Sequence, residues 1–395
     1  MTLRTLDGVN VFGKRAIVRV DFNVPVENGE IQDDTRIQAA LPTLKRLLDG
    51  GASLILISHL GRPKGNVNPD LSLRPVARRL SELLGRPVTL ADDVIGDDAH
   101  AKAANLRPGD VLLLENVRFE PGEEKNDDVL ARELAGLGDL YVNDAFGTAH
   151  RAHASTVGIA AHLPSYAGDL MVAEVNALGS LTNDPARPFV AILGGAKVSD
   201  KIGVIENLLS LVDAVLLGGG MANTFLLAEG KAVGDSLVES DFVDTANDVL
   251  SKASDKGVDV LLPVDVVAAQ GLDGEAAIVD ADSIPDGWAA FDIGPRTVQD
   301  YGKVIANAKT IFWNGPMGVF ERPAFASGTL GVARAVAESD AFTVVGGGDS
   351  VSAIEQSGLA DRISHISTGG GASLEFIEGR TLPGIAALED KGAIS

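Results

Sequence analysis

The chain has 395 residues, of which 45% are hydrophobic, and this length and composition predict a globular protein of two domains. Its 33 Lys and Arg residues and 55 Asp and Glu residues give a formal net charge of −22, which argues against nucleic-acid and anionic-membrane binding. The absence of cysteine excludes disulfides and thiolate chemistry, and without a signal-peptide pattern or an apolar run of about 18 residues we expect a cytoplasmic protein.

Short apolar segments alternate with amphipathic segments along the whole chain. Strands are predicted at residues 16–20, 53–57, 111–114, 140–142, 189–193, 214–217, 258–262, 310–313, 342–345 and 363–366. Several of them are apolar at every position, as expected for strands buried on both faces of a parallel sheet. Helices are predicted at 72–84 and 241–256, each with one apolar face and each ending at a glycine, Gly85 or Gly257. The repeated alternation predicts an α/β fold with parallel sheets.

A predicted helix at residues 170–181 and a turn-rich link at 182–188 divide the two halves of the chain. We therefore expect one domain over residues 1–169 and a second over 170–381. Residues 382–395 follow a break after the last predicted helix, so this tail is free to pack elsewhere than on the second domain.

Residues 143–156 read Asn-Asp-Ala-Phe-Gly-Thr-Ala-His-Arg-Ala-His-Ala-Ser-Thr and directly follow a predicted strand. Open α/β sheets bind their ligands at the carboxyl ends of their strands, so this polar run is a candidate site, with a solvated loop as the alternative. Other basic residues of the first half also lie at or near strand ends: Arg36, His59, Arg62 and Arg118. A lone arginine there is usually a surface residue, but several at one edge predict a small, highly anionic ligand.

The second half contains three glycine clusters between predicted strands and helices, at residues 194–201, 346–350 and 368–373. Glycine lets backbone N–H groups approach phosphate oxygens, although such turns also serve as simple connections. Neither a P-loop nor a dinucleotide-binding fingerprint is present. Lys197 and Lys201 lie where a helix is expected to begin, a position at which the helix dipole disfavours cations, so a bound anion explains them better.

Two further features of the second half suit a nucleotide. Asp349, beside three glycines, is a candidate Mg²⁺ ligand or, alternatively, the N-cap of a helix. In the loop at 313–321, Pro316 and Val319 offer apolar contacts and Glu321 offers an acceptor for a ribose hydroxyl. The alternative is a loop without a ligand, whose aromatic tip is simply packed in the protein. No nucleophile motif of the G-x-S-x-G type and no H-E-x-x-H metal motif occurs, so we expect direct transfer stabilised by charge.

The motifs at 19–25, 58–63, 143–156, 194–201, 313–321, 346–350 and 368–373 together resemble those of the phosphoglycerate kinase family, in the same order and over essentially the whole chain. The resemblance implies two Rossmann-like domains with mainly parallel sheets, joined by a helix across a cleft. It also implies that 3-phosphoglycerate binds to the N-terminal domain, that a Mg²⁺-nucleotide binds to the C-terminal domain, and that the tail at 382–395 packs back on the N-terminal domain.

The same resemblance assigns roles to individual residues. Phosphoglycerate would be bound by Asp21, Asn23, Arg36, His59, Arg62, Arg118 and Arg151. The nucleotide would be bound by Lys197, Lys201, Ala290, Asn314, Pro316, Val319, Glu321, Gly347, Gly348, Asp349 and Ser350, with Asp349 as the Mg²⁺ ligand. The phosphoryl group in transfer would be stabilised by Arg36, Lys197, Gly369, Gly370 and Gly371. One departure is that Ala290 stands where the family usually has Gly, which leaves the preference between ATP and GTP open.

The implied reaction is 1,3-bisphosphoglycerate + ADP ⇌ 3-phosphoglycerate + ATP, by in-line transfer after domain closure. The resemblance also implies a monomer. A nicotinamide dehydrogenase is disfavoured because the G-x-G-x-x-G fingerprint is missing. A non-catalytic protein that binds phosphometabolites or nucleotides is the alternative to a kinase.

Overall fold

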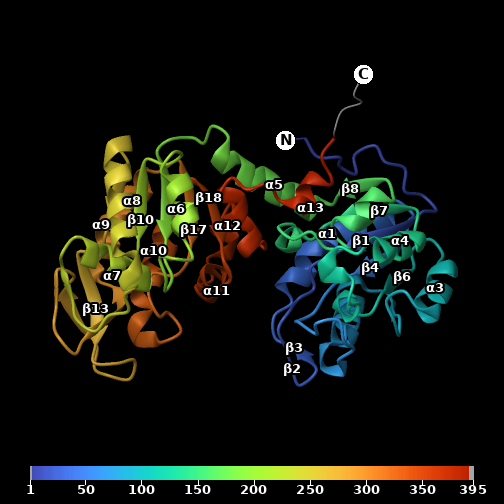
Figure 1. The fold of residues 1–395 in the computed structure, drawn as a ribbon, viewed down its shortest axis with the longest axis horizontal. Coiled ribbons are helices and arrows are strands. Elements are labelled where there is room, and N and C mark those ends of the chain that lie inside the picture. Colours follow the sequence, from blue (N-terminus) through green and yellow to red (C-terminus); the bar gives the residue numbers. More distant parts are fainter. Residues whose placement is uncertain (1, 391–395) are drawn as a thin grey trace. The chain divides into compact units, whose positions relative to one another are not determined.

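The computed structural model describes residues 2–390. Contacts divide the chain into two compact units: unit 1 comprises residues 1–176 and 381–395, and unit 2 comprises residues 177–380 (Figure 1). The division falls inside helix α5 (Asp169–Thr182), so this helix contributes residues to both units. Within the C-terminal tail at 382–395, residues 391–395 lie outside the described part of the chain.

Unit 1 is built on a six-stranded parallel sheet in the order β5-β6-β4-β1-β7-β8. Its strands are β1 (Arg15–Arg19), β4 (Ser53–Ile57), β5 (Val88–Leu90), β6 (Val111–Leu113), β7 (Leu140–Asn143) and β8 (Ser165–Ala167). Its α-helices are α1 (Thr35–Asp49), α2 (Arg74–Leu84), α3 (Asp97–Ala104), α4 (Asp128–Gly136) and α13 (Pro383–Ala386), and β2 (Val26–Glu27) pairs with β3 (Glu30–Ile31) as a hairpin. Every residue of β4 is buried, because the sheet is covered on both faces.

The C-terminal segment before residue 391 packs on unit 1. The amide of Gly384 donates to the carbonyl of Ala149 at 2.8 Å, and the amide of Arg4 donates to the carbonyl of Leu388 at 3.0 Å. Leu3 and Glu389 form an antiparallel bridge. The two ends of the described chain are therefore joined by backbone hydrogen bonds, and Gly384 is tied directly to the polar run at 143–156.

Unit 2 repeats the architecture with a parallel sheet in the order β12-β10-β9-β17-β18-β19. Its strands are β9 (Phe189–Leu193), β10 (Ala214–Leu217), β12 (Asp259–Leu261), β17 (Thr310–Asn314), β18 (Phe342–Gly346) and β19 (His365–Ile366). Its α-helices are α6 (Ile202–Leu208), α7 (Gly219–Ala228), α8 (Val243–Lys256), α9 (Pro295–Asn307), α10 (Ser327–Glu338), α11 (Gly348–Gln356) and α12 (Gly371–Ile377). The predicted α/β class with mainly parallel sheets is confirmed.

Smaller elements complete the two units. In unit 2, β13 (Asp265–Ala269) pairs antiparallel with β14 (Ala277–Asp280) and β16 (Ala289–Ile293), and β11 (Ala232–Val233) pairs with β15 (Ser283–Ile284). Short 3₁₀ helices lie at η1 (Pro69–Leu71), η2 (Val117–Phe119), η3 (Glu123–Lys125), η4 (Phe146–Thr148), η5 (Gly158–Ala161), η6 (Ser240–Phe242), η7 (Pro323–Phe325) and η8 (Ala360–Arg362). No helix within residues 2–390 has the length and apolar character needed to cross a membrane.

The two helices predicted from amphipathic patterns are present with shifted starts. The helix predicted at 72–84 begins at Arg74, and the one predicted at 241–256 begins at Val243, after the 3₁₀ turn η6. Both end where predicted, because Gly85 and Gly257 adopt φ values of 64° and 70° as left-handed C-caps.

Candidate active site

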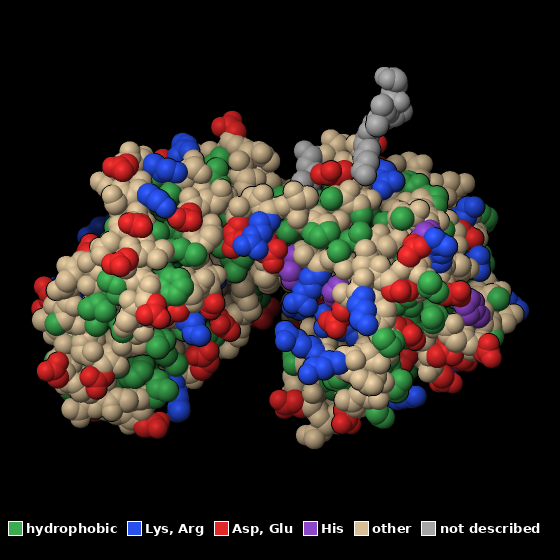
Figure 2. Space-filling model, viewed as in Figure 1, with side chains coloured by type: hydrophobic (Ala, Val, Ile, Leu, Met, Phe, Trp, Pro, Cys, Tyr) green, Lys and Arg blue, Asp and Glu red, His purple; other side chains and the backbone are tan. Residues whose placement is uncertain are grey.

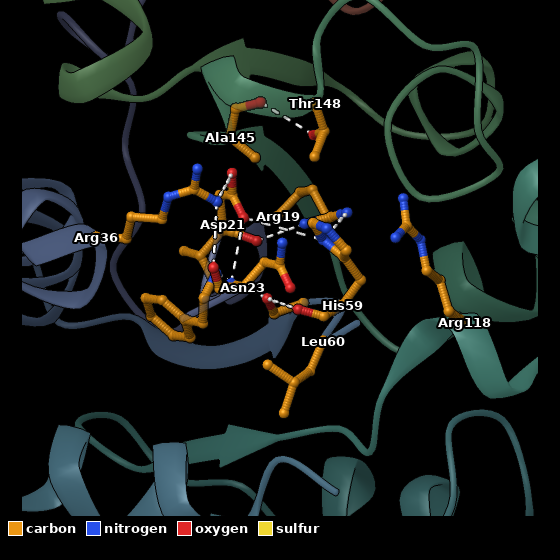
Figure 3. Close-up of polar contacts among 12 residues, drawn as sticks. Arg19, Asp21, Asn23, Arg36, His59, Leu60, Arg118, Ala145 and Thr148 are labelled. Carbon is orange, nitrogen blue, oxygen red and sulfur yellow. Dashed lines mark hydrogen bonds and ion pairs between the residues drawn. The ribbon is translucent and has the colours of Figure 1, made fainter. Parts of the chain in front are cut away.

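The carboxyl ends of the central strands of unit 1 lie side by side. The last residue of β1, Arg19, is in register with Ile57 of β4 on one side and with Asn143 of β7 on the other. The segments after β1, β4, β6 and β7 therefore start from one edge of the sheet (Figure 3). These segments, with the first turn of α1, carry all seven residues that were predicted to bind an anion.

Asp21 and Asn23, just after β1, hold Arg36 at this edge. Nη1 of Arg36 donates to the Asp21 carboxylate and to the Asn23 carbonyl, each at 3.2 Å. The side chain of Asn23 in turn accepts from the amide of Gly61 at 2.9 Å, which ties the loop after β1 to the loop after β4. Arg36 stays partly exposed, so its guanidinium is oriented and still has donors for a ligand.

Arg118 and His59 lie deeper in the same edge. Arg118 is 6% exposed and donates from Nη1 to the carbonyl of Gly61 at 2.7 Å. Its Nε is buried and makes no hydrogen bond among residues 2–390, although Oε1 of Glu124 lies 3.5 Å from it as an ion-pair partner. Burial, with the nearby charges of Arg19, Arg118, Arg36 and His153, lowers the pKa of His59 well below its usual value, so the ring is neutral near pH 7. A buried guanidinium with one N–H group that makes no hydrogen bond, beside several other cations, suits an anionic ligand.

The remaining predicted anion-binding residues, Arg62 and Arg151, are exposed. Nε of Arg151 donates to the ring of His150 at 3.1 Å. Figure 2 shows Lys, Arg and His side chains gathered on one part of the surface of unit 1, although the chain as a whole carries a net charge of −22. This local gathering of positive charge is what a candidate site for a small anion requires.

The run at 143–156 is mostly buried, so the alternative of a solvated loop is wrong. Asp144 has no exposed surface, and its Oδ1 accepts from the amides of Leu170 and Met171 at 3.0 and 3.3 Å. These amides belong to the first turn of α5, which the carboxylate caps. A Cβ at Gly168 would lie 2.1 Å from Asp144 Oδ1, so the approach requires glycine. Burial raises the pKa of Asp144 to about 7 despite these hydrogen bonds.

In unit 2, two of the glycine clusters and the loop after β17 meet around Asn314. Lys201 donates from Nζ to Oδ1 of Asn314, while Nδ2 of Asn314 is buried without a hydrogen-bond partner within the described chain. Gly347 has φ 89° and ψ 132°, and a Cβ there would lie 2.8 Å from Nδ2 of Asn314. The amide of Gly315 donates to the Ser350 hydroxyl at 2.5 Å. Burial lowers the pKa of Lys201, although Asp200 and Asp349 oppose this shift.

Two expectations about helix starts in unit 2 are corrected. Helix α6 begins at Ile202 with Lys201 as its N-cap, and Lys197 lies exposed in the preceding loop. The argument from the helix dipole therefore does not apply to Lys197. The N-cap of α11 is Gly347, so Asp349 is not the cap; it lies exposed in the first turn.

The third glycine cluster lies between β19 and α12. The Ser367 hydroxyl is 2.7 Å from that of Ser373 and accepts from the amide of Gly369 at 3.2 Å. Gly370 has φ 52°, which favours glycine, and a Cβ on Gly370 or on Gly371 would meet open space. This loop leaves room beside its backbone for a ligand.

Two segments that were predicted to line the nucleotide base are in contact. The amide of Val319 donates to the carbonyl of Phe291 at 2.8 Å, which brings the loop after β17 to strand β16. On the same strand, the amide of Ala290 donates to the Ser236 hydroxyl at 2.9 Å. Pro316 and Val319 are half-buried, and Glu321 is exposed.

Comparisons with known proteins agree with one another. The family model described as phosphoglycerate kinase matches residues 6–380. The phosphoglycerate kinases of Herpetosiphon aurantiacus and of a Roseiflexus species are each 59% identical over 394 residues, covering 99% of this chain and 100% of the relative. The chain belongs to the phosphoglycerate kinase family. The structure of the Coxiella burnetii phosphoglycerate kinase matches with a TM-score of 0.89 and 45% identity, covering 98% of both chains.

Membership of the phosphoglycerate kinase family confirms the family and the enzyme class predicted from the motifs. Among residues 2–390, no three His, Cys, Asp or Glu side chains are grouped so that they could hold a metal ion. Mg²⁺ bound with a nucleotide usually takes one or two carboxylates and completes its shell with phosphate oxygens and water. The exposed carboxylate of Asp349, beside the glycines before α11, fits such a site.

Three buried polar residues of unit 1 were not predicted from the sequence to belong to the candidate site: Arg19, Glu123 and Ser155. Arg19 carried a detectable signal, because it is a charged residue inside an otherwise apolar strand. Glu123 carried none, since it lies in a Glu-Glu-Lys run that reads as a solvated turn. Ser155 belongs to the polar run at 143–156 but was not distinguished from its neighbours.

Proposed function

We propose that this chain catalyses the reversible transfer of a phosphoryl group between 1,3-bisphosphoglycerate and ADP, giving 3-phosphoglycerate and ATP. The observation that carries this proposal is the positive, partly buried edge of the unit 1 sheet in a strongly acidic protein of the phosphoglycerate kinase family. A non-catalytic binding protein is not favoured, because Arg36, Lys197 and the glycines at 369–371 are all present.

Unit 1 would hold the phosphoglycerate. Arg62, Arg118 and Arg151 would bind its phosphate, since guanidinium groups pair with phosphate oxygens through parallel hydrogen bonds. Arg36, oriented by Asp21 and Asn23, would face the carboxyl group, which is the phosphoryl acceptor. A neutral His59 would add a hydrogen bond without adding a charge.

Unit 2 would hold the nucleotide. Lys201, Asn314 and the backbone at Gly347–Ser350 would contact the phosphates, and Pro316, Val319 and Ala290 would line the base. Glu321 would accept from a ribose hydroxyl. Asp349 would hold Mg²⁺, which when bound neutralises charge on the nucleotide phosphates.

Transfer would be direct. Phosphoryl transfer depends on positioning and on charge neutralisation, so the reaction does not require a covalent nucleophile. Arg36, Lys197 and the amides around Gly369 to Gly371 would stabilise the negative charge of the group in transfer. The reacting atoms must come within about 3–3.5 Å, so we propose that binding of both ligands brings the two units together. Small-angle scattering should show a compaction with both ligands that neither ligand produces alone.

A coupled assay tests the function directly. ATP and Mg²⁺ are supplied with or without 3-phosphoglycerate, and ADP formation is followed. We expect ADP only when phosphoglycerate is present. Tight binding of both ligands without turnover would support the non-catalytic alternative and would overturn the proposal.

The cellular location, the oligomeric state and the partners of the enzyme are also proposals. We expect a cytoplasmic monomer whose partners are its small-molecule substrates. Analytical ultracentrifugation should give a single species with the 40.9 kDa mass of one chain. A dimer that persists on dilution would contradict this expectation.

A further inference from the structure

Arg19 is a charged side chain with no exposed surface, at the centre of the positive edge of unit 1. Its Nε donates to the hydroxyl of Ser155 at 2.8 Å, and its Nη1 donates to the carbonyl of Val20. Its Nη2 lies 3.2 Å from Nδ1 of His59, a contact drawn in Figure 3. The guanidinium is thus engaged by the protein on three nitrogens and is covered from solvent.

The contact between Arg19 and His59 fixes the protonation state of the imidazole. A guanidinium has only donors, so Nδ1 of His59 must be the acceptor. A ring that accepts at Nδ1 is neutral and carries its proton on Nε2. The low pKa of His59 supports this state, and so do its neighbours: Arg36, Arg118 and His153 all disfavour a second proton. The Asp21 carboxylate lies 4.0 Å from Nδ1 and is itself bonded to Arg36.

Arg19 is in turn fixed by a serine and a buried carboxylate. Because the Ser155 hydroxyl accepts from Arg19, its single proton is directed to Oε1 of Glu123, at 2.6 Å. The Ser155 amide donates to Oε2 of the same carboxylate at 2.9 Å. Glu123 has no exposed surface, and its backbone carbonyl also accepts from the amide of Ala154 at 3.0 Å. The hydrogen bonds therefore run in one direction, from Arg19 through Ser155 to Glu123.

The negative charge of Glu123 compensates the positive charge of the buried Arg19. Burial opposes ionisation, but the His153 ring, the Arg19 charge and the Ser155 hydroxyl together lower the pKa of Glu123 below its usual value. The carboxylate is thus ionised and balances the buried Arg19 through one intervening hydroxyl. Removing either charge would leave the other uncompensated in the interior.

We propose that Glu123 and Ser155 are positioning residues of the phosphoglycerate half-site: through Arg19 they hold His59 as a neutral imidazole protonated at Nε2, ready to donate to an anionic substrate. The role toward substrate rests on the proposed function, whereas the state of His59 does not. Glu123 and Arg19 act through other residues and need not touch the ligand.

The state of His59 is read by NMR without any activity measurement. In protein labelled with ¹⁵N-histidine, two-bond ¹⁵N–¹H correlations distinguish the two neutral tautomers from the cation. The chain has six histidines, so the His59 signals are assigned with the variant His59→Gln. We expect the Nε2-protonated neutral form in the wild type at neutral pH.

Two variants test the chain of hydrogen bonds. Arg19→Lys keeps the charge, but one ammonium group on a flexible stem does not reproduce the fork that reaches both Ser155 and His59. Ser155→Ala removes the hydroxyl that joins Arg19 to Glu123. In both variants we expect the His59 signals to shift toward a mixture of tautomers. The KM for 3-phosphoglycerate should rise about tenfold with the KM for ATP unchanged.

The matched control is Arg15→Lys. Arg15 lies on the same strand, four residues before Arg19, and its Nη2 pairs with Asp139 at 3.0 Å. This variant should leave the His59 signals and both KM values unchanged.

Three results would overturn the proposal. These are a wild-type His59 protonated at Nδ1, a His59 that is cationic at pH 7, and His59 signals that respond to neither Arg19→Lys nor Ser155→Ala. If the variants do not fold, the wild-type spectrum still decides the tautomer. An inactive wild type whose His59 is protonated at Nε2 would overturn the proposed function and leave the positioning network standing.

Discussion

Replacing Gly347 by Ala should destabilise unit 2 by an amount that the structure allows us to work out. The residue has φ 89° and ψ 132°, a region that costs a residue with a Cβ about 1–3 kcal/mol. The new Cβ would lie 2.8 Å from Nδ2 of Asn314, and displacing this buried amide would weaken its bond with Lys201 by about 1 kcal/mol. The smaller freedom of Ala in the unfolded chain returns about 0.4–1 kcal/mol. The net loss is about 2 kcal/mol.

Urea unfolding followed by tryptophan fluorescence measures this decrease in the free energy of unfolding of unit 2. The chain has two tryptophans, Trp288 and Trp313, and both belong to unit 2. With a slope of about 2 kcal/mol per M of urea, the midpoint should fall by about 1 M. Gly348→Ala is the matched control, because a Cβ there meets open space and no positive φ opposes it. Equal midpoints for the two variants would refute the reasoning.

Three other variants test separate parts of the account. Lys197→Ala should lower kcat by roughly 100-fold or more in the coupled assay, because its charge is needed most as the phosphoryl group transfers; a raised KM for ATP with normal kcat would make Lys197 a binding residue only. Arg62→Ala should weaken calorimetric binding of 3-phosphoglycerate and spare ADP, and equal losses for both ligands would contradict the division between units. Burial raises the pKa of Asp292 to about 7, above the value of about 3.9 expected in the unfolded chain. The folded state therefore binds the extra proton between these values, and the stability it contributes at low pH is lost as pH rises through about 7. Asp292→Asn should flatten the fall of Tm between about pH 4 and 7, whereas an unchanged slope would assign that fall to other groups.

The sequence was sufficient to predict the strand ends at which the candidate site residues lie. The ends of strands can be predicted because apolar runs such as residues 53–57 stop at polar residues, here Ser58 and His59. Parallel strands then bring those ends to one edge, so the prediction of an anion site needed no knowledge of side-chain orientation. The antiparallel strands β13, β14 and β16 were missed, because their sequences lack a clear alternation of apolar and polar residues.

The residues that hold the candidate site residues in position could not be predicted, because they depend on contacts between distant segments. Glu123 and Arg19 are about a hundred residues apart, and their link through Ser155 exists only in the folded unit. Asp144 belongs to the polar run at 143–156 that was predicted as a candidate site, but its carboxylate accepts from the amides of α5. A pattern of residue types shows that a polar group is present and does not show which neighbour satisfies it.

The proposed reaction is a direct transfer between two ligands held by different units, without a phosphorylated enzyme. The most direct test uses ATP whose γ-phosphoryl group is made chiral with oxygen isotopes and follows the configuration at phosphorus in the 1,3-bisphosphoglycerate formed. A single in-line transfer inverts the configuration, so we expect inversion. Retention would require two successive transfers through a phosphorylated side chain, a histidine or a carboxylate in this cysteine-free protein, and would overturn direct transfer.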